Sequence, residues 1–174
     1  MNTATILALE VTVATDGWRK AVAAPEDVAA RAARAAYSAG SLDLGRPSEA
    51  TVVLTDDARV RLLNRDYRNK DRATNVLSFP AFDADDMVRL PVDAPLFLGD
   101  VFIALETATA EAVSESKTTT DHLSHLVVHG MLHLLGHDHE TDDEANIMER
   151  LESDVLAQLG VPDPYVLADE TAAS

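Results

Sequence analysis

Residues 121–139 read DHLSHLVVHGMLHLLGHDH and hold all six histidines of the chain. Four of these histidines are spaced by three or four residues: His122, His125, His129 and His133. In a helix they share one face, while leucine, valine and methionine cover most of the remaining surface. A helix that is apolar on most sides belongs in the middle of a fold, so the stretch predicts a central buried helix.

The same stretch has the spacing of a metal site. His129 and His133, at i and i+4, can aim two imidazoles at one point beside the helix. Gly136 can take the left-handed conformation that ends a helix, so that the chain doubles back and brings His139 to the first two. A single histidine on an apolar helix is ordinarily a core or surface residue. Six in one segment favour a three-histidine metal site with open coordination positions, on the helix and the turn after it.

Composition limits the class of protein. The chain has 174 residues, enough for one domain with its own core, and we predict a single catalytic domain over residues 1–165 and a flexible tail at 166–174. There are no cysteines, which excludes disulfides and thiolate zinc sites and fits a reducing compartment. The start of the chain resembles neither a signal peptide nor a membrane span, so we expect a soluble cytoplasmic protein with no membrane partner.

The remaining pattern predicts an α+β domain. Alternating apolar and β-branched residues predict four strands, at residues 6–13, 49–54, 75–79 and 97–104. Helix starts and stops predict helices at residues 25–40, from 55 to about 67, from 105 to about 116, from 118 to 136 and from 141 to about 160. The last two begin with threonine caps, because Thr118 with Asp121 resembles a capping box and Thr141 with Glu144 forms a second one. In the second of these helices, Val60, Leu63 and Tyr67 form the expected buried face. Residues 68–74 and 81–95 are predicted to be loops, and the order gives a small four-stranded sheet covered by helices.

Three neutral imidazoles around Zn²⁺ leave a position for a water molecule whose pKa falls to about 7, an arrangement typical of hydrolases. The offsets of His129, His133, Gly136 and His139 match those of the metzincin proteases. Those enzymes carry a glutamate, their general base, where this chain has Gly130. Proteolysis by that mechanism is therefore disfavoured.

A site without a carboxylate ligand keeps the full double charge of its metal, which favours an anionic substrate such as a phosphodiester. The net charge of −16 argues against a basic surface for nucleic acid as a whole. Six of the 14 Lys and Arg residues nevertheless fall within residues 59–72. Arg68 and Lys70 are the members best placed to reach a cleft and stabilise charge on phosphate oxygens. The alternative is an ordinary solvated helix face with Asp66 and Asp71 as partners.

Several blocks together resemble the YbeY family, bacterial endoribonucleases of ribosomal RNA maturation. HGMLHLLGHDH at residues 129–139 is similar to the family signature. Three further blocks agree in order and spacing: LNRDYRNKDRATNVLSFP at 63–80, LGDVFI at 98–103 and MERLE at 148–152. Ala73 stands where the family usually has proline, which departs from the pattern and leaves that loop less rigid.

The resemblance implies a fold and a function. The fold is a small mixed sheet flanked by helices, and His129, His133 and His139 hold one Zn²⁺ per chain, although other divalent transition metals also suit three histidines. Arg68 is the important arginine near the metal. The implied substrate is single-stranded RNA, in 16S rRNA 3′-end maturation, ribosome assembly and ribosome quality control, with the small ribosomal subunit and its proteins or assembly factors as partners.

Lys70, Asn75 and Ser78, in or beside the arginine segment, are further candidates for contacts with the substrate. His122, His125 and His137 lie outside the triad, and the sequence assigns them no role. Two other functions remain open. One is a ribosome-assembly binding factor with a structural zinc. The other is a metallopeptidase, which requires a carboxylate from elsewhere, such as Asp100 or Asp138, over the metal.

Overall fold

The structure, a computed structural model, describes residues 7–40, 47–82, 86, 89, 91 and 95–165. The strands are β1 (Leu7–Val13), β2 (Ser48–Thr55), β3 (Val76–Pro80) and β4 (Leu96–Ala104). The helices are α1 (Gly17–Ala21), α2 (Pro25–Gly40), α3 (Asp57–Arg68), α5 (Leu105–Ser114), α6 (Thr119–Leu134) and α7 (Asp142–Gln158). The α+β class with a four-stranded sheet is confirmed. The predicted tail at 166–174 and most of the connection at 81–95 lie outside the described residues.

The sheet is mixed, as predicted. Its order is β1-β2-β4-β3, in which β1, β2 and β4 are parallel and β3 runs antiparallel to β4. β3 therefore forms one edge of the sheet. None of the helices in the described part of the chain is long and apolar enough to cross a membrane.

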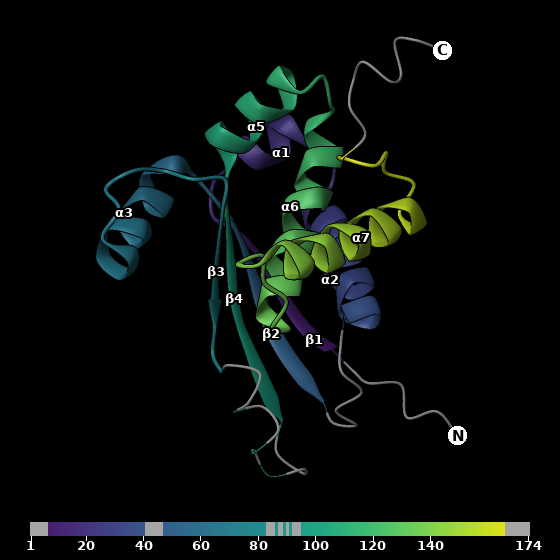
Figure 1. The fold of residues 1–174 in the computed structure, drawn as a ribbon. Helices are drawn as coiled ribbons and strands as arrows, with labels where there is room; N and C mark the ends of the chain where they lie inside the picture. The colour runs from purple at the N-terminus through teal and green to yellow at the C-terminus, as the bar shows by residue number, and fades with distance from the viewer. Residues whose placement is uncertain are drawn as a thin grey trace.

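Helix α6 is the central helix that its composition predicts. It lies against one face of the sheet, with α2 beside it and α7 crossing its outer side (Figure 1). Buried residues along its length, among them Leu123, Val127 and Met131, are 0% exposed. The main core draws on elements from β1 to α7, as one domain would, while the exact domain span of 1–165 stays a prediction.

Both threonine caps predicted from the sequence are present. The Thr118 side chain accepts the N–H of Asp121 at the start of α6, and Thr141 accepts the N–H of Glu144 at the start of α7. Each hydroxyl satisfies one of the backbone donors that a helix start leaves without a partner. The helices before and after the turn that carries His139, α6 and α7, therefore begin at the residues that the local sequence predicts.

Helix α3 packs on the opposite face, where Val60 joins Leu77 and Ala104 in a second, small apolar cluster. The buried face predicted for α3 is wrong at Tyr67, which is 71% exposed. Its ring lies edge-on to the ring of Phe79, at 5.5 Å between centroids. Asn64 is buried instead, and its Nδ2 donates to the carbonyl of Arg72 at 2.9 Å. A polar residue takes the inward position there because it ties the end of the helix to the following loop.

The short helix α1 was not predicted. Its five residues are too few to show a period, and its place depends on Trp18, which is fully buried and donates through Nε1 to the carbonyl of Thr55 at 2.8 Å. A second difference is that Arg68 is the last residue of α3 rather than part of the loop. A tertiary contact decides the place of α1, whereas the end of α3 follows from a local cap, Asn69, which is left-handed and whose N–H donates to the carbonyl of Arg65.

Helix α6 packs closely against the sheet at Gly130. A Cβ atom there would lie 2.6 Å from Cγ1 of Val101 and 3.2 Å from Oγ of Ser78. The Ser78 hydroxyl donates to the Gly130 carbonyl at 3.2 Å. Position 130 thus faces the sheet, and any side chain there would push the helix away from it.

We expect Gly130→Ala to lower the free energy of unfolding by about 1–3 kcal/mol, the usual cost of overpacking a core, even though alanine is the better helix former. Adding Val101→Ala removes the methyl groups in the way, so the double variant should be less destabilised than the sum of the single variants. Urea unfolding of all four proteins measures the coupling. Strictly additive effects would show that the two positions do not touch.

Candidate metal centre

The final turns of α6 carry two of the predicted ligands. His129 and His133 are half-buried, one turn apart, and their Nε2 atoms are 3.0 Å apart. Two nitrogens bound to one tetrahedral zinc ion at its usual bond length lie roughly 3.3 Å apart. The helix alone thus provides a pair of donors at a spacing that suits a metal ion.

The turn after α6 brings the third histidine, as predicted. Gly136 has a φ of +95°, and its N–H donates to the carbonyl of His133 at 3.1 Å. The next N–H, from His137, donates to the carbonyl of Leu132 at 3.0 Å. These two bonds end the helix in the pattern that a left-handed glycine allows and reverse the chain. His139 follows directly, and its N–H donates to Oδ1 of Asp138 at 2.8 Å.

The three side chains form one group that could hold a metal ion. One nitrogen from each of His129, His133 and His139 lies within 4.8 Å of the other two. Burial, with a smaller effect from His129 and His139 nearby, lowers the pKa of His133 to about 4. This imidazole is therefore neutral near pH 7, which is the form that binds a metal. The donor set, three imidazoles, fits a divalent transition metal.

Glu152 of α7 contacts this group, and the sequence had assigned it no role. Its side chain is 1% exposed, and its Oε1 lies 2.5 Å from Nδ1 of His129. Burial raises the pKa of Glu152, but hydrogen bonds from His125 and His129 outweigh that effect and bring the pKa down to about 2. One signal in the sequence could have revealed it. Glu152 occupies an inward position of α7, between Met148 and Val155, where an acid needs a partner.

The triad opens into a cleft of about 800 Å³ between the end of α6 and the edge strand β3. Of the residues predicted from the arginine segment, Arg68, Asn75 and Ser78 line this cleft together with the three histidines. Lys70 is exposed and is not among the lining residues. The structure therefore brings together the triad and Arg68, which lie far apart in sequence.

Arg68 is held against β3 by two contacts. Its Nη2 donates to the carbonyl of Ser78 at 3.0 Å, and its Cζ lies 5.8 Å from the centre of the Phe79 ring. A guanidinium has five N–H donors, so donors remain for a ligand in the cleft. Elsewhere in residues 59–72, Arg61 pairs with Asp71 and Arg65 pairs with Asp66. This part of the basic segment is therefore an ordinary solvated helix face, which was the alternative to a substrate-binding role.

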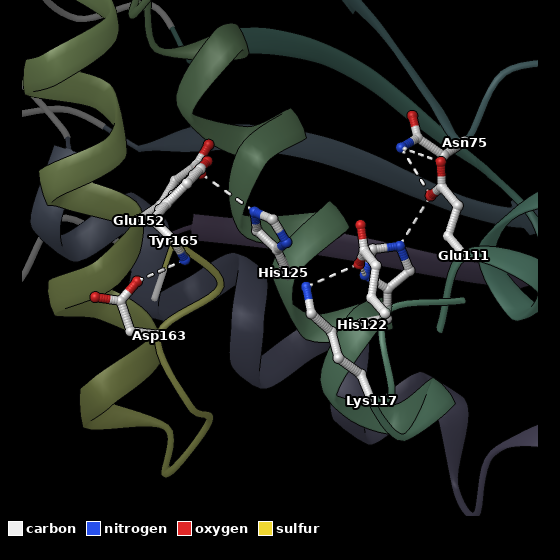
Figure 2. Close-up of polar contacts among 9 residues, drawn as sticks. Asn75, Glu111, Lys117, His122, His125, Glu152, Asp163 and Tyr165 are labelled. Carbon is white, nitrogen blue, oxygen red and sulfur yellow. Dashed lines mark hydrogen bonds and ion pairs between the residues drawn. The ribbon is translucent and has the colours of Figure 1, made fainter. Parts of the chain in front are cut away.

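The other two cleft candidates use their polar groups within the protein. Asn75 donates through Nδ2 to both carboxylate oxygens of Glu111, at 3.0 and 3.3 Å (Figure 2). Its Oδ1 accepts the N–H of Val76. The Ser78 hydroxyl is the donor to Gly130 described above. A role for Asn75, Ser78 and Lys70 in substrate binding stays a prediction.

The histidines outside the triad have protein partners. His122 lies 2.9 Å from Oε1 of Glu111, and His125 lies 3.2 Å from Oε2 of Glu152 (Figure 2). His137 lines the cleft, but its Nε2 donates to the carbonyl of Gly40 at the end of α2. These contacts join α6 and its turn to the neighbouring helices.

Of the two carboxylates considered for a peptidase, Asp100 faces away from the triad, and Asp138 lines its cleft with one oxygen engaged in the turn. Asp100 alternates along β4 with Val101, which packs against Gly130, so Asp100 faces the other side of the sheet. Burial raises its pKa, and a hydrogen bond from Thr51 lowers it. Asp138 does line the cleft, but its Oδ1 accepts the N–H of His139. Its contact shapes the turn that carries the third ligand.

Comparison with known proteins gives a consistent match. Residues 15–160 match the family described as Endoribonuclease YbeY. Endoribonuclease YbeY of Azorhizobium caulinodans is 49% identical, with 93% of this chain and 98% of the relative covered. The protein of the same name from Paramagnetospirillum magneticum is 50% identical over 90% of this chain and 94% of its own length.

A solved structure matches the fold. The solution structure of TM1509 from Thermotoga maritima has a TM-score of 0.54 and 18% identity, over 92% of this chain and 97% of that one. At this level of identity the likeness concerns the fold alone.

We expect elemental analysis to find about one divalent metal ion per chain in the wild-type protein, and none in His129→Ala or His133→Ala, because two ligands hold such an ion far more weakly than three. His137→Ala is the matched control. It removes a histidine of the same cleft whose nitrogen already has a partner, so it should retain the metal. An equal metal content in all four proteins would exclude the triad as the binding site.

Proposed function

The chain belongs to the Endoribonuclease YbeY family, and on that premise we propose that it is a metal-dependent endoribonuclease that hydrolyses single-stranded RNA. One observation carries the proposal. His129, His133 and His139 line the same open cleft as Arg68, so a site for a divalent ion and a fixed positive charge face the same space. A phosphodiester needs both kinds of group.

The residues of the chain have distinct roles in this proposal. The three histidines hold the ion, zinc or another divalent transition metal. The chemistry that such an ion supplies is Lewis-acid catalysis, with polarisation of a phosphoryl oxygen and a lower pKa for water. Arg68, held by Ser78 and Phe79, presents its remaining N–H donors to the phosphate oxygens and stabilises the charge that develops there.

The biological substrate that we propose is precursor 16S rRNA at its 3′ end, within the small ribosomal subunit or together with its assembly factors. Support comes from the resemblance of the signature, the arginine segment and the closing helix to a family that acts in ribosome maturation. The cytoplasm is the matching compartment. Asp86, Asp138 and Glu140 also line the cleft, so the positive charge offered to a phosphate there comes from Arg68 and from the ion that the histidines would hold.

The geometry favours this function over the two alternatives. A structural zinc site is closed and has four protein ligands, whereas here three histidines border an open cleft and the side chain of His139 is 54% exposed. A peptidase of the metzincin type needs a glutamate at position 130. That position faces Val101 of the sheet and has no room for a side chain.

We expect Arg68→Ala to slow cleavage of a labelled single-stranded RNA by about 10²–10³-fold, the usual effect of losing a donor that stabilises transition-state charge, while its metal content stays that of wild type. Arg65→Ala is the matched control. It removes an arginine from the same helix, paired on the surface with Asp66, and should keep full activity.

His133→Ala should be inactive in the same assay. If wild type, His133→Ala and Arg68→Ala cleave at equal rates, the activity comes from a contaminating nuclease and the proposal is wrong.

Removal of the metal should separate catalysis from folding. The main core is built from apolar side chains of the sheet and of the helices around it and includes none of the three histidines. After treatment with a chelator, we expect circular dichroism to show the native secondary structure and RNA cleavage to be lost, then restored by added metal. Unfolding on chelation would instead favour the binding factor with a structural zinc.

A further inference from the structure

Glu152 is a buried carboxylate whose close polar partners are histidines instead of lysine or arginine. It lies in the middle of α7 and is 0% exposed, and its partners on α6 are His125 and His129. Burying a carboxylate costs several kcal/mol unless hydrogen bonds and opposite charge compensate for the loss of water. An apolar residue at this helix position would pack between α6 and α7 without that cost.

Three donors converge on this carboxylate. Nδ1 of His129 lies 2.5 Å from Oε1, and Nε2 of His125 lies 3.2 Å from Oε2. The hydroxyl of Tyr165, in the segment after α7, also donates to Oε2. Figure 2 shows Glu152 reaching from α7 toward His125, with Tyr165 beside it, and the ring of Tyr165 meets that of His125 edge-on at 5.9 Å.

This geometry determines which nitrogen of His129 carries a proton. Nδ1 of His129, Nε2 of His125 and the Tyr165 hydroxyl all converge on this carboxylate, so it acts as the acceptor and Nδ1 of His129 as the donor. A neutral imidazole with its proton on Nδ1 has a lone pair on Nε2, and this Nε2 faces Nε2 of His133 at 3.0 Å. The same contact fixes the orientation of the ring, because Nδ1 is tied to a different helix.

We propose that Glu152 is a positioning residue for the metal centre. It holds the ring of His129 and keeps the proton on Nδ1, so that Nε2 is free to bind the ion. His125 and Tyr165 in turn hold Glu152, which couples the segment after α7 to the site. This inference rests on the proposed metal site.

The test compares Glu152→Gln with Glu149→Gln. The first replaces an acceptor by an amide whose NH₂ group opposes one of the three donors. The second makes the same change at an exposed position of the same helix. Zinc affinity is measured by competition with a chromophoric chelator. We expect Glu152→Gln to bind zinc about 10- to 100-fold more weakly, the usual effect of losing an outer partner of a ligating histidine, and Glu149→Gln to bind like wild type.

A second measurement uses the zinc-loaded wild-type protein and does not depend on how a variant folds. The ¹⁵N and ¹H resonances of the His129 ring distinguish a protonated nitrogen from one bound to the metal. We expect zinc on Nε2, and on Nδ1 a proton that exchanges slowly with water. The nitrogen that carries zinc is a property that a merely structural role for Glu152 would not set.

The outcomes are separable. If wild type binds no metal, the proposed function fails. If wild type binds zinc and Glu152→Gln binds it equally well, or if zinc sits on Nδ1 of His129, the proposed role of Glu152 is wrong while the metal site stands. If Glu152→Gln does not fold, the spectrum of the zinc-loaded wild type decides the question.

Discussion

The close contact between α6 and the sheet at Gly130 is the constraint on which the site depends. With no side chain at that position, the helix backbone approaches Val101 of β4 and accepts a hydrogen bond from the Ser78 hydroxyl of β3. The carbonyl of the same Ser78 accepts the bond from Arg68. One residue of the edge strand thus connects the helix that carries the histidines with the arginine, and sets the two within one cleft.

Much of the fold around the site could be predicted from residues that are close together in the sequence. The caps at Thr118 and Thr141, the turn at Gly136 and the apolar character of α6 depend on residues close in sequence, and the structure has them as predicted. The triad could be predicted for the same reason, since helix geometry fixes the distance between i and i+4 and one glycine supplies the reversal.

What could not be predicted depends on contacts between distant parts of the chain. The position of Trp18 follows from a carbonyl on β2, and the exposure of Tyr67 follows from where α3 meets the sheet. Gly130 is the clearest case. From sequence it marks a missing glutamate, whereas the structure shows a position that helix packing keeps empty. Glu152 lies in the segment MERLE, which resembles a block of the family, but the sequence does not show what it contacts. Its contacts with His125 and His129 exist because α7 crosses α6.

Two histidines of the triad lie on a helix and the third lies on a turn. This division determines which of the three can move to fit ions of different size. The spacing of the two helical histidines is set by the backbone of α6, which the sheet holds in place, so this pair cannot follow a change in ionic radius. The third ligand stands on an exposed turn whose main chain is tied locally, through Asp138. If the triad holds an ion, His139 is therefore the ligand with the most freedom to follow a change in bond length, and the ion would exchange on the side of this exposed imidazole.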